Sequence, residues 1–141
     1  MAGEPDETEV IRAAKAACVH ELILTLPQGY DTIMKSGETD LSAGQKQRIA
    51  LARALYGDPA FLVLDEPNSA LDAEGQQALT EAILKMKTDG KIVIISSHHP
   101  AGLAAVDRLI VLGNGTVVAQ GPRDQVLKSM IAAIEKNRKA G

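Results

Sequence analysis

The sequence contains few aromatic residues and little cysteine. Two tyrosines, one phenylalanine and no tryptophan occur in 141 residues, so stacked aromatic platforms for nucleic-acid bases are not expected. The single Cys18 cannot form an internal disulfide, and we interpret it as a small buried hydrophobic residue. Basic residues are outnumbered by acidic ones, 15 against 18, which argues against a nucleic-acid partner.

Long apolar runs are missing as well. None approaches the roughly 18 residues that indicate a membrane-spanning helix, so no such segment is expected. The first residues, MAGEPDETE, are acidic and polar, unlike a secretory signal peptide. The composition that is present, 45% apolar and 23% charged residues, is typical of a folded globular protein.

The first 57 residues have the patterns of helices and loops. Apolar residues recur at helical spacing across Pro5–Leu26, where Asp6 or Thr8 can cap the start and a second short helix forms the end. A turn at Pro27–Gly29 and an irregular loop follow, and then a helix is predicted over Gly44–Tyr56. We therefore expect a helical subdomain over residues 1–57.

Residues 58–141 have a different rhythm. The short apolar runs Phe61–Leu64 and Ile92–Ile95 are typical of strands covered on both faces, and an amphipathic helix over Ala73–Met86 separates them. A short helix over Ala101–Val106 is expected next. This order predicts an α/β layer with a parallel strand pair, and because two buried strands make a thin sheet, we expect further strands to be missing.

The end of the sequence predicts a hairpin and a helix. Leu109–Leu112 and Thr116–Ala119 flank Asn114-Gly115, a pair that permits the positive φ angles of a type I′ turn. A last helix over residues 122–139 has a basic end, which suits the helix dipole.

Two adjacent acids follow the first predicted strand. Asp65 and Glu66 would lie at the carboxyl end of a parallel sheet, where open α/β proteins bind their ligands. Asp65 can hold Mg²⁺, which prefers carboxylate and phosphate oxygens, and Glu66 can accept a proton from an attacking water. A strand end with two solvated acids is the alternative interpretation.

Small residues open the helix that precedes this strand. Ser42-Ala43-Gly44 would expose backbone N–H groups at the positive end of the helix dipole, where phosphate is a natural ligand, although an ordinary serine cap has the same pattern. His98 follows the second buried strand and can hydrogen-bond a terminal phosphate or be an ordinary surface histidine.

These blocks resemble the ATP-binding-cassette (ABC) ATPases, in order and in spacing, from about Leu26 to Leu127. The matching segments are the signature motif at Leu41–Gln45, the Walker B strand at Phe61–Glu66, the D-loop at Ser69–Asp72 and the switch histidine at His98. The segments Ala-Leu-Tyr-Gly-Asp-Pro and Leu-Asp-Glu-Pro-Asn-Ser are similar to those of bacterial type I secretion exporters of the protease/lipase branch.

The resemblance implies an α/β fold of the P-loop NTPase type and ATP hydrolysis that powers export. It implies a homodimer of cassettes that closes over ATP and Mg²⁺. The residues it assigns to ATP binding are Leu41, Ser42, Ala43, Gly44 and Gln45, with Asp65 for the metal and Glu66, His98 and Asp72 for catalysis. His98 is aligned with the switch position in preference to His99.

The resemblance also implies partners and a location. An exporter membrane domain, a periplasmic adaptor and an outer-membrane channel would work with the cassette, at the cytoplasmic face of the bacterial inner membrane, without nucleic acid. Lys35, Ser36 and Glu38 stand where related exporters tend to have Gly, Glu and Gly, so coupling to the membrane domain is in question.

One expected motif is missing from the sequence. The P-loop pattern G-x-x-x-x-G-K-[ST] does not occur, so we expect the chain to correspond to the carboxyl-terminal half of a cassette, without the Walker A half and the membrane domain. Two alternatives follow. The chain is an inert remnant or interaction module, or it derives from a soluble DNA-repair ABC ATPase, which the lack of heptads and basic patches disfavours.

Overall fold

The computed structural model describes residues 5–34, 41–98 and 103–139. The chain divides into two compact units, Met1–Gly102 and Leu103–Gly141. Lys35, Ser36 and Glu38, the three positions that differ from the residues typical of related exporters, lie outside the described residues, as does His99.

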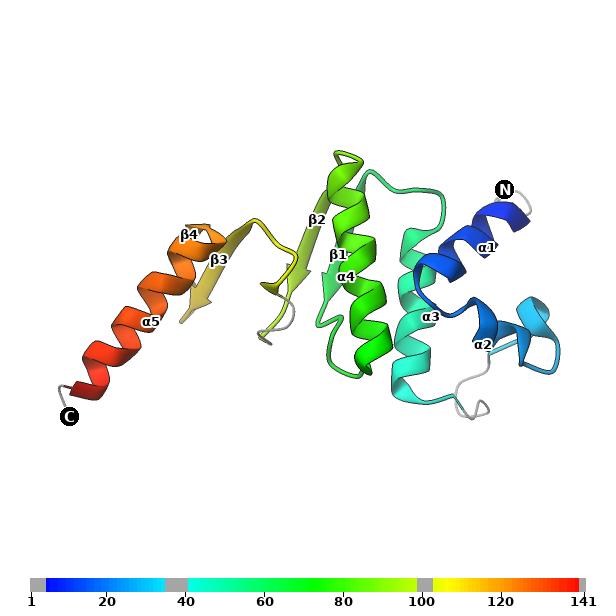
Figure 1. Cartoon of the computed structure of the whole chain (residues 1–141), viewed down its shortest axis with the longest axis horizontal. Coiled ribbons are helices and arrows are strands. Elements are labelled where there is room, and N and C mark those ends of the chain that lie inside the picture. The colour runs from blue at the N-terminus through cyan, green and yellow to red at the C-terminus, as the bar shows by residue number, and fades with distance from the viewer. Residues whose placement is uncertain (1–4, 35–40, 99–102, 140–141) are drawn as a thin grey trace. The chain divides into compact units, whose positions relative to one another are not determined.

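Helices form the amino-terminal part of the first unit, as expected. They are α1 (Glu7–Ala16), α2 (His20–Leu24), a 3₁₀ turn η1 (Gly29–Asp31) and α3 (Ala43–Leu55). The Asp6 carboxylate accepts the Thr8 amide at 2.9 Å, so Asp6 is the cap of α1. Helix α1 packs against α3 (Figure 1). None of the helices in the described part of the chain is long and apolar enough to cross a membrane.

The interpretation of Cys18 as a buried residue is wrong. The helical pattern is interrupted between α1 and α2, and Cys18 has φ +49° at this break. The left-handed turn leaves Cys18 exposed, while its neighbours Ala17 and Val19 are both fully buried. Helical spacing predicted the buried face correctly except at this position, where the backbone leaves the helix.

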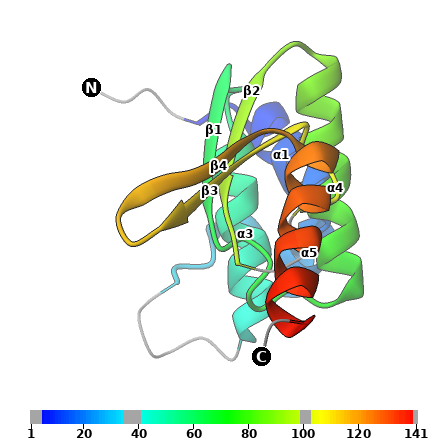
Figure 2. The same ribbon diagram turned by 90° about the vertical axis from the view of Figure 1, so that its left-hand side faces the viewer.

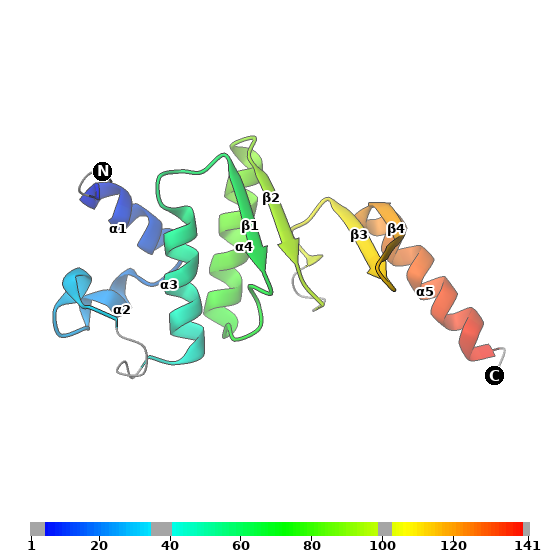
Figure 3. The same cartoon turned by 180° about the vertical axis from the view of Figure 1, so that it is seen from behind.

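A parallel strand pair forms the other part of the first unit. Strand β1 (Phe61–Asp65) pairs with β2 (Ile92–Ser96), with Leu62 opposite Val93 and Asp65 opposite Ser96. Helix α4 (Ala73–Thr88) connects them and lies against one face of the pair (Figures 1 and 3). The predicted strand–helix–strand order is confirmed, and it brings the ends of β1 and β2 together.

The expectation that both faces of these strands are covered is wrong for the described residues. Leu62 and Leu64 face α4 and are only 4% and 9% exposed. Phe61 and Val63 alternate with them and are 52% and 59% exposed, because no described element of this unit packs on that face. A continuous apolar run does not distinguish one covered face from two.

The second unit is a hairpin followed by a helix. Strands β3 (Arg108–Gly113) and β4 (Thr116–Pro122) are antiparallel, and α5 (Arg123–Lys139) packs against them (Figure 2). Asn114 and Gly115 have φ of +50° and +76°, as a type I′ turn requires. The short helix expected over Ala101–Val106 lies partly outside the described residues, and Ala104–Val106 are not helical.

Candidate functional site

The carboxyl end of β1 turns sharply at Glu66. This residue has φ +46°, a left-handed conformation that costs a non-glycine residue about 1–2 kcal/mol. Its amide donates to the Ser96 carbonyl at 2.9 Å, so the turn is tied to the end of β2. The strain places the Glu66 side chain across the sheet edge, toward the segment that follows β2.

Glu66 and His98 meet at this edge. His98 Nδ1 lies 2.6 Å from Glu66 Oε1, and the His98 amide donates to the same oxygen at 3.2 Å. The Glu66 side chain is 33% exposed and the His98 side chain 78% exposed. The carboxylate is therefore held in one direction while a water molecule still reaches it. A carboxylate in this setting can act as a general base.

Asp65 differs from Glu66 although the two are neighbours. Its carboxylate is exposed and has no hydrogen-bond partner among the described residues. No cluster of three or more metal-ligating side chains occurs in the part of the chain that the structure describes. Mg²⁺ keeps several waters and binds through one or two carboxylates plus substrate phosphates, so a single accessible aspartate fits this ion.

The start of α3 is open to solvent. Ser42 and Gln45 form a capping box, in which Ser42 Oγ accepts the Gln45 amide at 3.2 Å and Gln45 Oε1 accepts the Ser42 amide at 2.8 Å. Ser42 and Ala43 are exposed, and the amides of Ala43 and Gly44 have no acceptor within the helix. This first turn can therefore receive an anion.

Gly44 brings α3 against the loop that follows Glu66. A Cβ at this position would lie 2.6 Å from the Ala70 carbonyl oxygen, closer than a carbon atom can approach. Glycine is thus required at position 44 because α3 approaches the Ala70 carbonyl too closely for a Cβ, and not because of its backbone conformation. The predicted signature segment and the predicted D-loop touch at this point.

Asp72 begins α4 and also contacts α3. Its Oδ1 accepts the Gly75 amide at 2.9 Å, and its Oδ2 lies 3.3 Å from Arg48 Nη2. Arg48 also pairs with Glu74 at 2.9 Å and donates to the Cys18 carbonyl at 3.1 Å. Asp72 therefore holds the end of the D-loop in place.

Sequence analysis did not single out Gln47 and Arg48. Both lie on the face of α3 that carries Gly44, because residues three and four positions apart are neighbours on a helix. Gln47 hydrogen-bonds the segment between Glu66 and Ala70. Helical spacing from Gly44 was the signal that could have found both residues.

The comparisons with known proteins agree with these observations. A family model described as ABC transporter matches residues 4–69. The chain is 56% identical over 122 residues to the type I secretion system ATP-binding protein PrsD of Rhizobium meliloti (strain 1021). The aligned region covers 86% of this chain and 21% of that protein. The chain belongs to the ABC transporter ATPase family.

Other members of the ABC family are similar over the same region. The putative multidrug export ATP-binding/permease protein YgaD of Bacillus subtilis (strain 168) is 39% identical, over 89% of this chain and 22% of that protein. The structure of a bacterial Atm1-family ABC exporter with ATP bound matches with a TM-score of 0.79 and 32% identity, over 99% of this chain and 24% of that one. The chain thus spans about a fifth of the length of these relatives, and the expected α/β cassette fold is confirmed.

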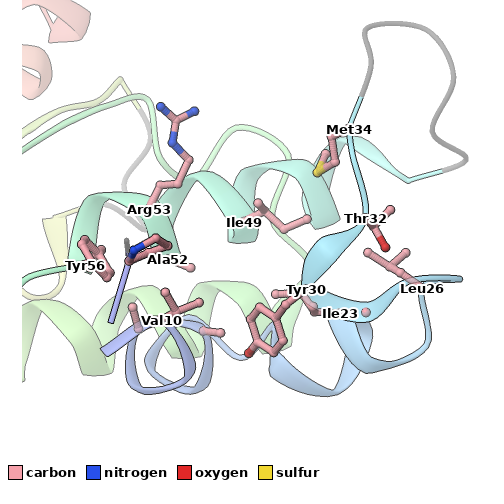
Figure 4. Close-up of a pocket in the computed structure, with 14 residues that line it drawn as sticks. Val10, Ile23, Leu26, Tyr30, Thr32, Met34, Ile49, Ala52, Arg53 and Tyr56 are labelled. Atoms are coloured by element: carbon pink, nitrogen blue, oxygen red, sulfur yellow. The ribbon is translucent and has the colours of Figure 1, made fainter. Parts of the chain in front are cut away.

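A cavity of about 410 Å³ lies among α1, α2 and α3 of this ABC chain (Figure 4), and neither Glu66 nor His98 is among its lining residues. Its lining is mostly apolar and consists of Pro5, Val10, Ala13, Ala14, Ile23, Leu26, Gly29, Tyr30, Thr32, Met34, Ile49, Ala52, Arg53 and Tyr56. Both tyrosines of the sequence, Tyr30 and Tyr56, line this cavity.

The two tyrosine hydroxyls are hydrogen-bonded. Tyr56 Oη accepts the Asp6 amide at 3.1 Å, and Tyr30 Oη lies 2.8 Å from His20 Nδ1. Partial burial raises the pKa of the Tyr30 hydroxyl, and the nearby negative charge of Glu21 raises it further. Tyr30 is therefore neutral at physiological pH. Its side chain lines the cavity, and its hydroxyl is hydrogen-bonded to His20.

Proposed function

We propose that this chain is part of an ATPase that powers protein export by a type I secretion system. The contact between Glu66 and His98 supports the proposal, because it brings a carboxylate and an imidazole together at the carboxyl end of a parallel strand pair, where open α/β proteins bind their ligands. The name of the Rhizobium relative, a type I secretion system ATP-binding protein, supports the choice of export system.

The proposed chemistry is hydrolysis of the β–γ bond of ATP. The Glu66 carboxylate accepts a proton as water attacks the γ-phosphorus, and ADP leaves with the bridging oxygen. His98 holds the carboxylate in direction and donates a hydrogen bond to the γ-phosphate oxygens. Asp65 would hold Mg²⁺, which would supply positive charge to neutralise the phosphates. Phosphoryl transfer depends mainly on positioning and electrostatics, and these residues supply both.

The open start of α3 serves a second nucleotide in this proposal. Ser42 and the amides of Ala43 and Gly44 bind the γ-phosphate of ATP held by another copy of the chain, and Leu41 and Gln45 position that turn. Exposure of Ser42 and Ala43 supports this role. Residues 1–57 would supply this contact, and residues 58–141 would supply the base and the metal ligand. Asp72 would connect the two ATP sites of the dimer.

The membrane domain is the partner we propose for the helical region. The name of the Bacillus relative joins an ATP-binding and a permease function in one protein, and this chain covers only 22% of it. The apolar cavity among α1, α2 and α3 suits an apolar segment of such a domain. This arrangement would place the chain at the cytoplasmic face of the bacterial inner membrane, with a periplasmic adaptor and an outer-membrane channel completing the system.

The test is Glu66→Gln in the complete transporter that contains this chain. We expect turnover to fall by about 10²–10⁴, the usual contribution of a general base, with ATP binding retained. Glu81→Gln is the matched control, because Glu81 is exposed on α4 and its one side-chain hydrogen-bond partner among the described residues is Gln77. Unchanged steady-state hydrolysis in Glu66→Gln would refute the proposed role. Continued export of an extracellular protein by the same variant would refute the link to secretion.

A further inference from the structure

We propose that Gln47 is a positioning residue that fixes Glu66 and the D-loop relative to the start of α3. This inference rests on the proposed function, since it concerns the geometry of the same base. It adds a residue outside the signature, Walker B and D-loop segments that sequence analysis assigned.

The carboxamide of Gln47 uses both of its ends. Its Nε2 donates to the Glu66 carbonyl at 3.0 Å and to Ser69 Oγ at 3.3 Å, and its Oε1 accepts the Ala70 amide at 3.0 Å. One side chain of α3 therefore closes the loop from Glu66 to Ala70 upon itself. A carboxylate or an apolar side chain cannot satisfy all three contacts, because they require two donor directions and one acceptor.

The contacts surround the strained residue. The Glu66 amide is held by Ser96, and the Glu66 carbonyl accepts from Gln47 and from the Ser69 amide at 3.2 Å. Both peptide groups beside the Glu66 Cα are thus fixed, and the left-handed conformation that aims the carboxylate at His98 is maintained. Without Gln47, the carbonyl side keeps only the local turn bond from Ser69.

The same side chain connects the two parts of the site. Gln47 lies one turn after Gly44, whose position against the Ala70 carbonyl leaves no room for a Cβ. A shift of the first turn of α3 is therefore transmitted to Ala70 by contact and to Glu66 by hydrogen bond. A phosphate that shifts the first turn of α3 on binding would therefore also change the orientation of the Glu66 carboxylate.

The experiment compares Gln47→Met with the control Gln77→Met in the complete transporter. Gln77 lies on the exposed face of α4, and its side chain hydrogen-bonds Glu81 at 2.9 Å and no other residue in the described part of the chain. We expect Gln47→Met to lower kcat about tenfold and to leave KM for ATP within about twofold, because misplacement of a base affects the chemical step. Wild-type kcat in Gln47→Met, together with impaired Glu66→Gln, would overturn this inference and leave the proposed function intact.

A double variant separates positioning from general loss of stability. If Gln47 acts through Glu66, Gln47→Met should have little further effect on kcat in the Glu66→Gln background. A full tenfold effect in that background would show that Gln47 acts elsewhere. Gln47→Glu keeps the acceptor for the Ala70 amide and loses the donor to the Glu66 carbonyl, so wild-type kcat in this variant would also contradict the inference.

Amide hydrogen exchange in the 141-residue chain tests the contact itself. Gln47→Met should raise the exchange rate of the Ala70 amide at least about tenfold, whereas Gln77→Met should leave it unchanged. Equal exchange of the Ala70 amide in both variants would show that the hydrogen bond from this amide to Gln47 does not form in solution, whatever the activity of the transporter.

Discussion

Each end of the β1–β2 pair carries a contact between an acidic and a basic side chain, and the two contacts differ in their exposure to solvent. At each end the side chain of a residue with left-handed backbone, Asp58 or Glu66, contacts a basic side chain beside the other strand. At the amino end the partner is Lys91, a permanent cation whose side chain is only 14% exposed. At the carboxyl end it is His98, whose side chain is 78% exposed. The first pair is suited to holding the strands, and the second to chemistry.

The largest expected effect tests this contrast directly. In the complete transporter, His98→Gln should lower ATP turnover by about 10² or more, because in the proposed mechanism His98 positions both the base and the phosphate. The unfolding midpoint should change little, since most of the His98 side chain is in solvent. Turnover is measured by phosphate release and stability by thermal unfolding.

Lys91→Met is the counterpart at the other end. It should lower the unfolding midpoint and leave turnover within about twofold, because Lys91 pairs with Asp58 and does not contact the site. The contrast would fail if Lys91→Met lost turnover as His98→Gln does.

A second, intermediate effect concerns how α3 reinforces the carboxyl end. Gly44→Ala places a methyl group against the Ala70 carbonyl, so the helix or the loop must shift. We expect a loss of about 1–3 kcal/mol in the free energy of unfolding, measured with urea. The control is Ala43→Ser at the neighbouring exposed position, for which a change within about 0.5 kcal/mol is expected. Equal stability of both variants would mean that α3 does not constrain the loop.

The sequence predicted much of this arrangement because its signals are local. Apolar spacing indicated the helices, apolar runs indicated β1 and β2, and Asn114-Gly115 indicated the hairpin. Glu66 and His98 could be brought to one sheet edge because parallel strands end together. The roles assigned to the site residues stay predictions until the variants are measured.

The remaining features depend on contacts between distant segments. The hydrogen bonds of Gln47 link α3 to a loop 19 residues further along the chain. Helical spacing places Gln47 on the face of α3 that carries Gly44, but no local pattern gives its distant partners. The bare face of β1 was misjudged because Phe61 and Val63 are as apolar as Leu62. Cys18 was misjudged because spacing alone does not reveal a left-handed break.

The smallest effect is a pH dependence at the amino end. The hydrogen bond from Lys91 lowers the pKa of the Asp58 carboxyl below its ordinary value, and the positive charges of Lys91 and Arg12 act in the same direction. A lowered folded pKa means that the stabilisation is complete above the unfolded value, about 3.9, and is lost as pH falls through the folded pKa. Asp58→Asn should therefore unfold at lower urea than the wild type at pH 6, with the difference shrinking below about pH 4. Asp31→Asn, at an exposed position in η1, is the control. A difference that stays constant with pH would show that the Asp58 charge does not stabilise this end.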